Sequence, residues 1–145
     1  PGRYAYEFFH QGNLEPNKTV TTWLPSLVKY KKVVILIDGG PQSTAEVMAA
    51  TLKKYNVGIL VGTKTRGWGT IEKVFSLDNQ IGGGEKYSMF LVHSLTVRDD
   101  GNAIEGAGVE PVINITNPNW EKELNKYFSF PTLINAVNEV LKKGL

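Results

Sequence analysis

Cysteine is absent from the chain, and histidine occurs only twice in 145 residues. The first absence excludes disulfides, thiolate metal sites and a cysteine nucleophile, and the second argues against a multi-histidine metal site. Lys and Arg number 16 against 14 for Asp and Glu, a net charge of +2, which is too small a bias to indicate a nucleic-acid partner. No run approaches the ~18 apolar residues of a membrane span. We therefore expect no metal, no cofactor, no nucleic acid and no membrane span.

Hydrophobic residues make up 41% of the chain and charged residues 21%, which is ordinary for one globular domain of this length. The chain begins with Pro1-Gly2-Arg3 and shows neither an initiator Met nor an apolar leader. We interpret it as part of a longer protein, so a catalytic group that is missing here can lie on another segment.

The first half predicts a strand–helix–strand unit. Val33 to Ile37 is a continuous, largely β-branched run that is typical of a buried strand covered on both faces. A Gly-Gly turn follows, and Ser43 to Glu46 fits the start of a helix that continues to Tyr55. Val57 to Val61 is the next apolar strand. Such units usually have parallel strands.

The second half changes character. The expected elements are alternating strands at 71–77 and 87–97 with a glycine turn at 82–84, a turn at 98–102, a short strand at 112–115, a polar connection from 118, and an amphipathic helix at 131–141. A short helix is also expected within 19–30. Taken together, the pattern predicts one α/β domain with a mixed sheet flanked by helices.

Ser43 stands on a tight turn between the buried strand and the helix. Its hydroxyl would lie beside the backbone N–H of Thr44 and the helix N-terminus, a natural setting for stabilising an oxyanion. The setting resembles a nucleophile elbow, although the Gly-x-Ser-x-Gly pattern is absent. The alternative is a helix cap, in which Ser43 and Glu46 form a capping box. The local residues leave both interpretations open.

Two glycine-rich segments follow. Gly62 to Thr70 has alternating glycines that let a backbone approach a ligand or another strand closely, but it lacks the spacing and the helix of a phosphate-binding loop. Gly101 to Pro111 holds Glu105 between glycines, where a carboxylate can orient an imidazole. The alternative for Glu105 is a solvated loop acid.

The three segments together resemble, in order and spacing, the catalytic core of the C-terminal processing (tail-specific) serine peptidases. The resemblance covers roughly residues 33–115. The matching positions are the strand at 33–37, Ser43 with Glu46, the motif Gly62, Thr65, Gly67, Gly69 and Thr70, and the motif Gly101, Ile104, Gly106, Gly108, Val109 and Pro111. Pro1-Gly2 is similar to the end of the family's Asn-Pro-Gly-Gly loop, although Arg3 replaces the second Gly.

The resemblance implies a ClpP/crotonase-like ββα fold that is truncated at its N-terminus, with residues 1–145 as the C-terminal part of the catalytic domain. It also implies protein or peptide substrates and an extracytoplasmic location, periplasmic or secreted. Two assemblies are consistent with it: a homo-oligomer, or a pairing with the missing N-terminal part.

One position departs from the family's Ser–Lys branch. The general-base Lys of that branch corresponds to Trp68, and its Gln to Glu72. An indole cannot accept a proton, so Trp68 cannot supply the base. The chain resembles the Ser–His–Glu branch instead, that of the chlamydial protease-like activity factor, where the Glu corresponds to Glu105. The His of that branch lies upstream of the Pro-Gly loop, a position that neither His10 nor His93 occupies.

The resemblance implies a serine endopeptidase that works by acyl transfer. Ser43 would be the nucleophile, an upstream His oriented by Glu105 the base, and the N–H groups of Thr44 and Gly2 the oxyanion hole. The chain alone would then have little or no peptidase activity.

Two other functions compete with this one. A pseudopeptidase would keep the fold and bind peptides or a protein partner without cleaving them, and an upstream His would argue against it. An acyl-CoA enzyme of the crotonase type shares the ββα architecture but needs no nucleophilic Ser. Failure to bind coenzyme A would exclude that second alternative.

Overall fold

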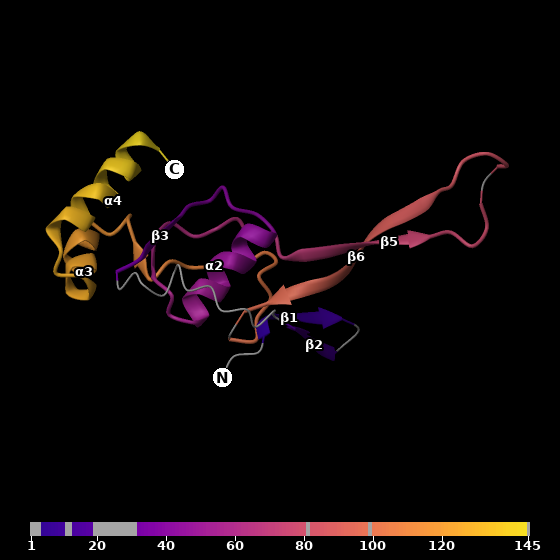
Figure 1. Cartoon of the computed structure of the whole chain (residues 1–145), viewed down its shortest axis with the longest axis horizontal. Helices are drawn as coiled ribbons and strands as arrows, with labels where there is room; N and C mark the ends of the chain where they lie inside the picture. The colour runs from indigo at the N-terminus through magenta and orange to yellow at the C-terminus, as the bar shows by residue number, and fades with distance from the viewer. Residues whose placement is uncertain (1–3, 11–12, 19–31, 81, 99, 145) are drawn as a thin grey trace.

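The computed structural model describes residues 4–10, 13–18, 32–80, 82–98 and 100–144 (Figure 1). Its elements are, in chain order, β1 (Tyr4–His10), β2 (Asn13–Lys18), β3 (Val34–Ile37), α2 (Thr44–Lys54), β4 (Ile59–Gly62), β5 (Thr70–Ser76), β6 (Ser88–Val97), β7 (Ile113–Asn114), α3 (Trp120–Tyr127) and α4 (Pro131–Lys143). The short helix expected within 19–30 lies outside the described residues.

The strands form two sheets. The first has the order β2-β1-β6-β5 with antiparallel neighbours, and the second has the order β3-β4-β7 with parallel neighbours. Consecutive strands pair as hairpins in the first sheet, β1 with β2 and β5 with β6, whereas the parallel strands of the second need crossover connections. The expected α/β class is thus confirmed, but the antiparallel and parallel strands lie in two separate sheets and not in one mixed sheet. The strands β1 and β2 were not among the sequence-based predictions.

The predicted strand–helix–strand unit is present as β3, α2 and β4. The two strands are parallel, with Val34 opposite Ile59 and Ile37 opposite Gly62. Side chains of β3 alternate between two cores, because successive residues of a strand point to opposite faces. Ile37 packs in the core beneath α2, and Leu36 packs against the core formed with α3 and α4. Both faces of β3 are therefore covered as expected, with Ile37 buried and its other residues half-buried.

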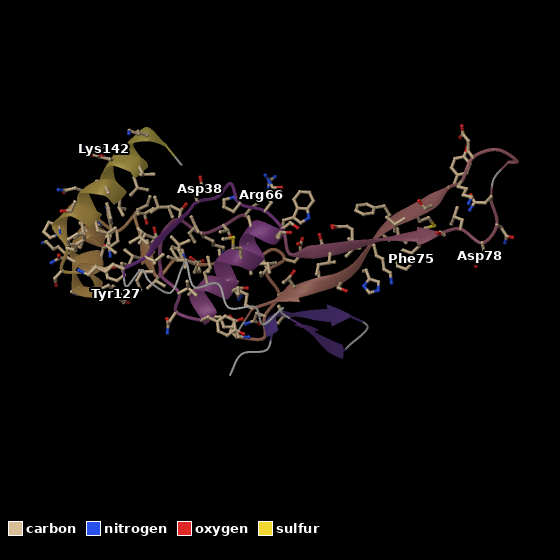
Figure 2. The ribbon with its side chains drawn as sticks, in the orientation of Figure 1. Asp38, Arg66, Phe75, Asp78, Tyr127 and Lys142 are labelled. Atoms are coloured by element: carbon tan, nitrogen blue, oxygen red, sulfur yellow. The ribbon has the colours of Figure 1, made fainter. Side chains whose placement is uncertain are left out.

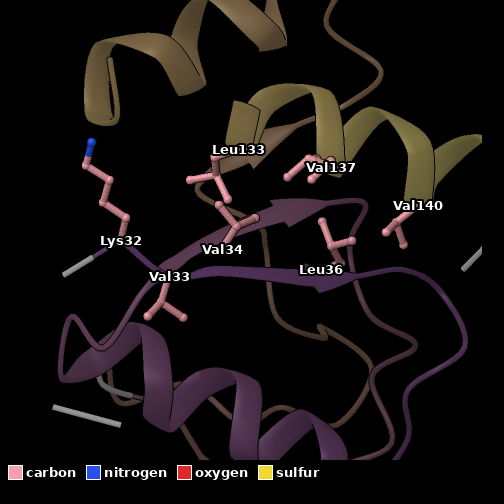
Figure 3. Close-up of a pocket in the computed structure, with 8 residues that line it drawn as sticks. Lys32, Val33, Val34, Leu36, Leu133, Val137 and Val140 are labelled. Carbon is pink, nitrogen blue, oxygen red and sulfur yellow. The ribbon is translucent and has the colours of Figure 1, made fainter. Parts of the chain in front are cut away.

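Figure 3 shows how β3 and α4 face each other. Val34 and Leu36 point toward α4, while Val33 points toward α2. Between β3 and α4 lies an open, mainly apolar groove of about 370 Å³. Its lining residues are Lys32, Val33, Val34, Leu36, Leu133, Ala136, Val137 and Val140.

The hairpin of β5 and β6 extends away from the body of the molecule as a two-stranded arm (Figure 1). Phe75 and Asp78 lie on this arm, far from Tyr127 and Lys142 on the terminal helices (Figure 2). Several large apolar side chains on the arm are solvent-exposed: Val74, Phe75, Tyr87, Met89, Phe90, Leu91 and Val92. The arm is therefore held mainly by its own strand pairing and by β1, which pairs with the base of β6.

The C-terminal part forms a helical layer over the parallel sheet. The polar connection expected from 118 is wrong over most of its length, because residues 120–127 form α3. Leu124 is fully buried and anchors this otherwise charged helix against β7 and α4. The predicted final helix is confirmed as α4. No helix within the described ranges is long and apolar enough to cross a membrane.

Candidate active site

Ser43 occupies the sharp turn between β3 and α2. Its backbone angles are φ 51° and ψ −119°, a left-handed conformation that costs a non-glycine residue roughly 1–3 kcal/mol. The Ser43 N–H donates to the carbonyl oxygen of Trp68 at 2.9 Å, which fixes this turn to the loop at 62–70. The hydroxyl makes no capping hydrogen bond to the helix. The capping box is therefore wrong, and the turn has the strained geometry of a nucleophile elbow.

Glu46 explains why the box does not form. Its side chain is fully buried and turned away from the backbone of Ser43 toward the loop at 62–70. Its carboxylate accepts hydrogen bonds from the Thr65 hydroxyl at 2.5 Å and from the N–H groups of Gly67 and Trp68 at 2.7 Å each. Glu46 thus holds the loop whose carbonyl in turn holds Ser43.

The two glycine-rich segments pack directly against each other. The Gly106 N–H donates to the Gly67 carbonyl at 2.8 Å. A Cβ on Gly69 would lie 2.6 Å from the backbone nitrogen of Glu105, and one on Gly108 would collide with the Thr65 carbonyl. The prediction that the alternating glycines allow a close backbone approach is confirmed, and the backbone that approaches is the segment at 101–111.

Glu105 lies on this second segment. Its side chain is exposed, but one carboxylate oxygen accepts a hydrogen bond from the Gly69 N–H at 2.7 Å. Gly69 directly follows Trp68, whose carbonyl accepts the Ser43 N–H. Ser43 and Glu105 are therefore both tied to adjacent residues of the same loop. Glu105 is neither buried nor free of contacts.

Trp68 presents its indole to solvent, with 47% of the residue exposed. The indole Nε1 donates to the Thr70 hydroxyl at 2.9 Å. This arrangement provides a donor but no acceptor for a serine proton. The backbone of Trp68 supports Ser43, whereas its side chain cannot act as a base.

The basic side chains near this loop make contacts away from Ser43. The Lys64 Nζ lies 3.6 Å from a carboxylate oxygen of Glu110, and the Lys73 Nζ lies 5.6 Å from the centre of the Phe75 ring. His93, on β6, is half-buried, with Nδ1 at 2.7 Å from the Ser94 hydroxyl. These contacts make His93 a packed residue of strand β6.

A cleft of about 290 Å³ opens beside Ser43. It is lined by Ser43, Thr44, Val47, Thr70, Ile71, Glu72 and Thr96. Thr44 begins α2, and within the described part of the chain its N–H has no hydrogen-bond acceptor. A hydroxyl, a free N–H at a helix N-terminus and a cleft thus share one place. This arrangement suits attack on a carbonyl and stabilisation of the resulting oxyanion.

Comparison with known proteins identifies the chain. The model of peptidase family S41 matches residues 4–115. The chain belongs to peptidase family S41. The carboxy-terminal-processing protease of Bartonella bacilliformis is 29% identical over 99 residues, which are 68% of this chain and 21% of that protein. The carboxy-terminal processing protease CtpB of Bacillus subtilis is 30% identical over 129 residues, which are 83% of this chain and 26% of that protein.

A solved structure also matches this S41 chain. The photosystem II D1 C-terminal processing protease aligns with a TM-score of 0.50 and 26% identity, over 58% of this chain and 20% of that one. The family resemblance deduced from the three motifs is confirmed by these matches. This chain spans between about a fifth and about a quarter of the length of the three relatives.

The turn before Glu105 is reinforced electrostatically in this S41 chain. The Asn102 N–H donates to the Asp100 carboxylate at 3.0 Å and holds its pKa below the usual range, and Arg98 lowers the pKa further. Arg98 also donates to the Gly108 carbonyl at 3.0 Å. Arg98 thereby links the start of the segment that carries Glu105 to Gly108, near its other end.

Gly2, the expected second oxyanion donor, lies outside the described residues. Among those that are described, no group of three or more His, Cys, Asp or Glu side chains is arranged to hold a metal ion. The structural role of Glu46 was missed, because a Glu three residues after a Ser at a helix start also fits a capping box.

Proposed function

We propose that this S41 chain contributes the nucleophile of a serine endopeptidase of the C-terminal processing type. The observation that carries the proposal is the strained turn of Ser43, whose hydroxyl makes no cap and lines a cleft beside the free Thr44 N–H. A serine that served only as a helix cap would bond to the helix backbone. The matches to carboxy-terminal-processing proteases support the same reaction.

The proposed reaction is acyl transfer in two steps. The Ser43 oxygen attacks the carbonyl carbon of the scissile peptide bond while a base removes the hydroxyl proton. The carbonyl oxygen becomes an oxyanion and accepts the Thr44 N–H, with Gly2 as the proposed second donor. The C–N bond then breaks, and the base returns the proton to the leaving amine. In the second step water attacks the ester carbonyl while the base removes its proton, the bond between the acyl carbon and the Ser43 oxygen breaks, and the base returns the proton to Ser43.

We propose an imidazole as the base, oriented by Glu105 and contributed by a segment upstream of this chain. One Glu105 oxygen is already engaged by the Gly69 N–H, which leaves the other oxygen for the ring N–H of the imidazole. The isolated chain is then expected to hydrolyse peptides slowly or not at all. An extracytoplasmic location is part of the same proposal and rests on the family resemblance.

A second candidate is peptide binding without cleavage. It is favoured by one observation: no His or Lys is among the described residues that line the cleft. In that case the cleft would hold an extended peptide or a partner segment, and Ser43 would remain unreactive.

A fluorophosphonate probe distinguishes the two candidates. It would be applied to the protein expressed from its complete gene, and adducts would be mapped by mass spectrometry. The matched controls are Ser43→Ala, in the cleft, and Ser88→Ala, at the exposed end of β6 on the arm. Labelling at Ser43 that persists in Ser88→Ala supports the peptidase. A folded protein without an adduct at Ser43 supports peptide binding alone.

A further inference from the structure

Glu72 is the only charged side chain among the described residues that line the cleft beside Ser43. It lies on β5 two residues after Thr70 and is half-buried. By the family resemblance this position corresponds to the neutral Gln of the Ser–Lys branch, and in this chain it carries a carboxylate instead. The proposed peptidase reaction does not use Glu72, and what a carboxylate does at this place needs a separate explanation.

The Glu72 carboxylate is held in a fixed orientation. The Trp68 Nε1 donates to the Thr70 hydroxyl at 2.9 Å, and that hydroxyl donates to Glu72 Oε1 at 2.7 Å. Over the described ranges, Glu72 has neither a salt bridge nor a partner for its second oxygen. The chain of donors therefore orients one oxygen and leaves the other available to a ligand.

The surroundings of Glu72 suit a long side chain with a positive end. Val47 and Ile71 provide apolar surface in the cleft, and Thr96 adds a small polar side chain to its lining. An alkyl stem can lie along such apolar surface while its cationic head reaches a carboxylate. Lys73, the next residue on β5, does not neutralise Glu72, because its Nζ lies over the Phe75 ring.

We infer that Glu72 is a specificity-determining residue, which selects substrates with a Lys or Arg side chain next to the scissile bond. The inference rests on the proposed peptidase function and adds the class of substrate side chain. A hydrogen bond to a charged group contributes enough free energy for roughly a tenfold preference or more. The preference would act on peptides of otherwise identical sequence.

The test uses paired fluorogenic peptides that differ at one position, with Lys in one and norleucine in the other. This pair is scanned across the residues beside the scissile bond, on the protein expressed from its complete gene. The wild type is expected to favour the Lys peptide about tenfold in kcat/KM at one of these positions. Glu72→Gln is expected to bring the ratio close to one, and Glu72→Lys to favour a peptide with Glu at the same position. Glu139→Gln, on the exposed surface of α4, is the matched control and should leave the ratio unchanged.

The outcomes separate the selectivity from the activity. Hydrolysis of both peptides with equal kcat/KM, lost in Ser43→Ala, would overturn the role of Glu72 and keep the peptidase. An equal fall for both peptides in Glu72→Gln would also overturn it, since Glu72 would then act in catalysis itself. If neither peptide is hydrolysed, the peptidase fails, and the same Lys-to-norleucine ratio is measured as binding by fluorescence anisotropy. Absence of a preference in that binding overturns the inference as well.

Discussion

Replacing Glu46 with Gln keeps the size of a fully buried side chain but exchanges one acceptor oxygen for an N–H₂ donor. Glu46 accepts hydrogen bonds from the Thr65 hydroxyl, the Gly67 N–H and the Trp68 N–H. The first two share Oε1, and the third uses Oε2. The Gln side chain can keep its oxygen at Oε1, but its nitrogen then faces the Trp68 N–H, and two donors oppose each other.

The structure sets the size of the effect. A hydrogen bond to a charged acceptor contributes roughly 1.5–3 kcal/mol, and a buried donor without an acceptor carries a similar cost. We therefore expect Glu46→Gln to lower the free energy of unfolding by about 2 kcal/mol. Glu46→Ala leaves all three donors without acceptors and adds a cavity, so we expect about 4 kcal/mol or more. A domain of this size has a total stability of about 5–15 kcal/mol.

Urea unfolding followed by far-UV circular dichroism measures these changes. Glu110→Ala is the matched control, because Glu110 also contacts the loop at 62–70, through Lys64 at 3.6 Å, but does so in solvent. An exposed ion pair of this kind contributes less than about 1 kcal/mol. A Glu46→Gln variant as stable as Glu110→Ala would refute the reasoning, since the buried carboxylate would then not be holding the loop.

Three further predictions follow from local geometry. Ser43→Gly should be more stable than Ser43→Ala by about 1 kcal/mol in thermal unfolding, because Gly adopts the positive φ of this turn without strain; equal stabilities would show that the turn is not strained. Gly108→Ala should destabilise the chain by several kcal/mol, roughly threefold more than Gly101→Ala. Both glycines have a positive φ, but only Gly108 is packed against the backbone of another segment, at Thr65. The lowered pKa of Asp100 means that its contribution to stability is present above pH ~4, near the carboxyl's unfolded pKa, and is lost as the pH falls further. Asp100→Asn should therefore flatten the decline in urea stability between neutral and acidic pH, and an unchanged acid profile would contradict this.

The sequence predicted the elements that bury a continuous apolar run. The strand at 34–37 has no polar residue and could pack only in a core. The helix α3 was missed because half of its eight residues are charged, and only Leu124, which is buried, and Trp120, which is partly buried, pack against the core. A periodic pattern needs several apolar residues before it can be recognised.

The candidate site was predicted in its members but not in all of its contacts. The family resemblance grouped Ser43, the loop and Glu105, and the structure shows that Ser43 and Glu105 both hydrogen-bond to the loop. The partner of Glu46 could not be predicted, because a Glu at this place satisfies a helix N-terminus as readily as it satisfies a distant loop. Only the folded chain shows that Thr65 and two N–H groups already converge on this carboxylate.

The contact between Ser43 and Trp68 uses main-chain atoms alone. Any amino acid at position 68 that tolerates the loop conformation would supply the same carbonyl, whatever its side chain. The main chain of residue 68 thus holds Ser43, and its side chain takes no part in this contact. Replacing the side chain at this position therefore leaves the acceptor for the Ser43 N–H in place. The turn that holds Ser43 is thus insulated from the chemical character of the residue at position 68.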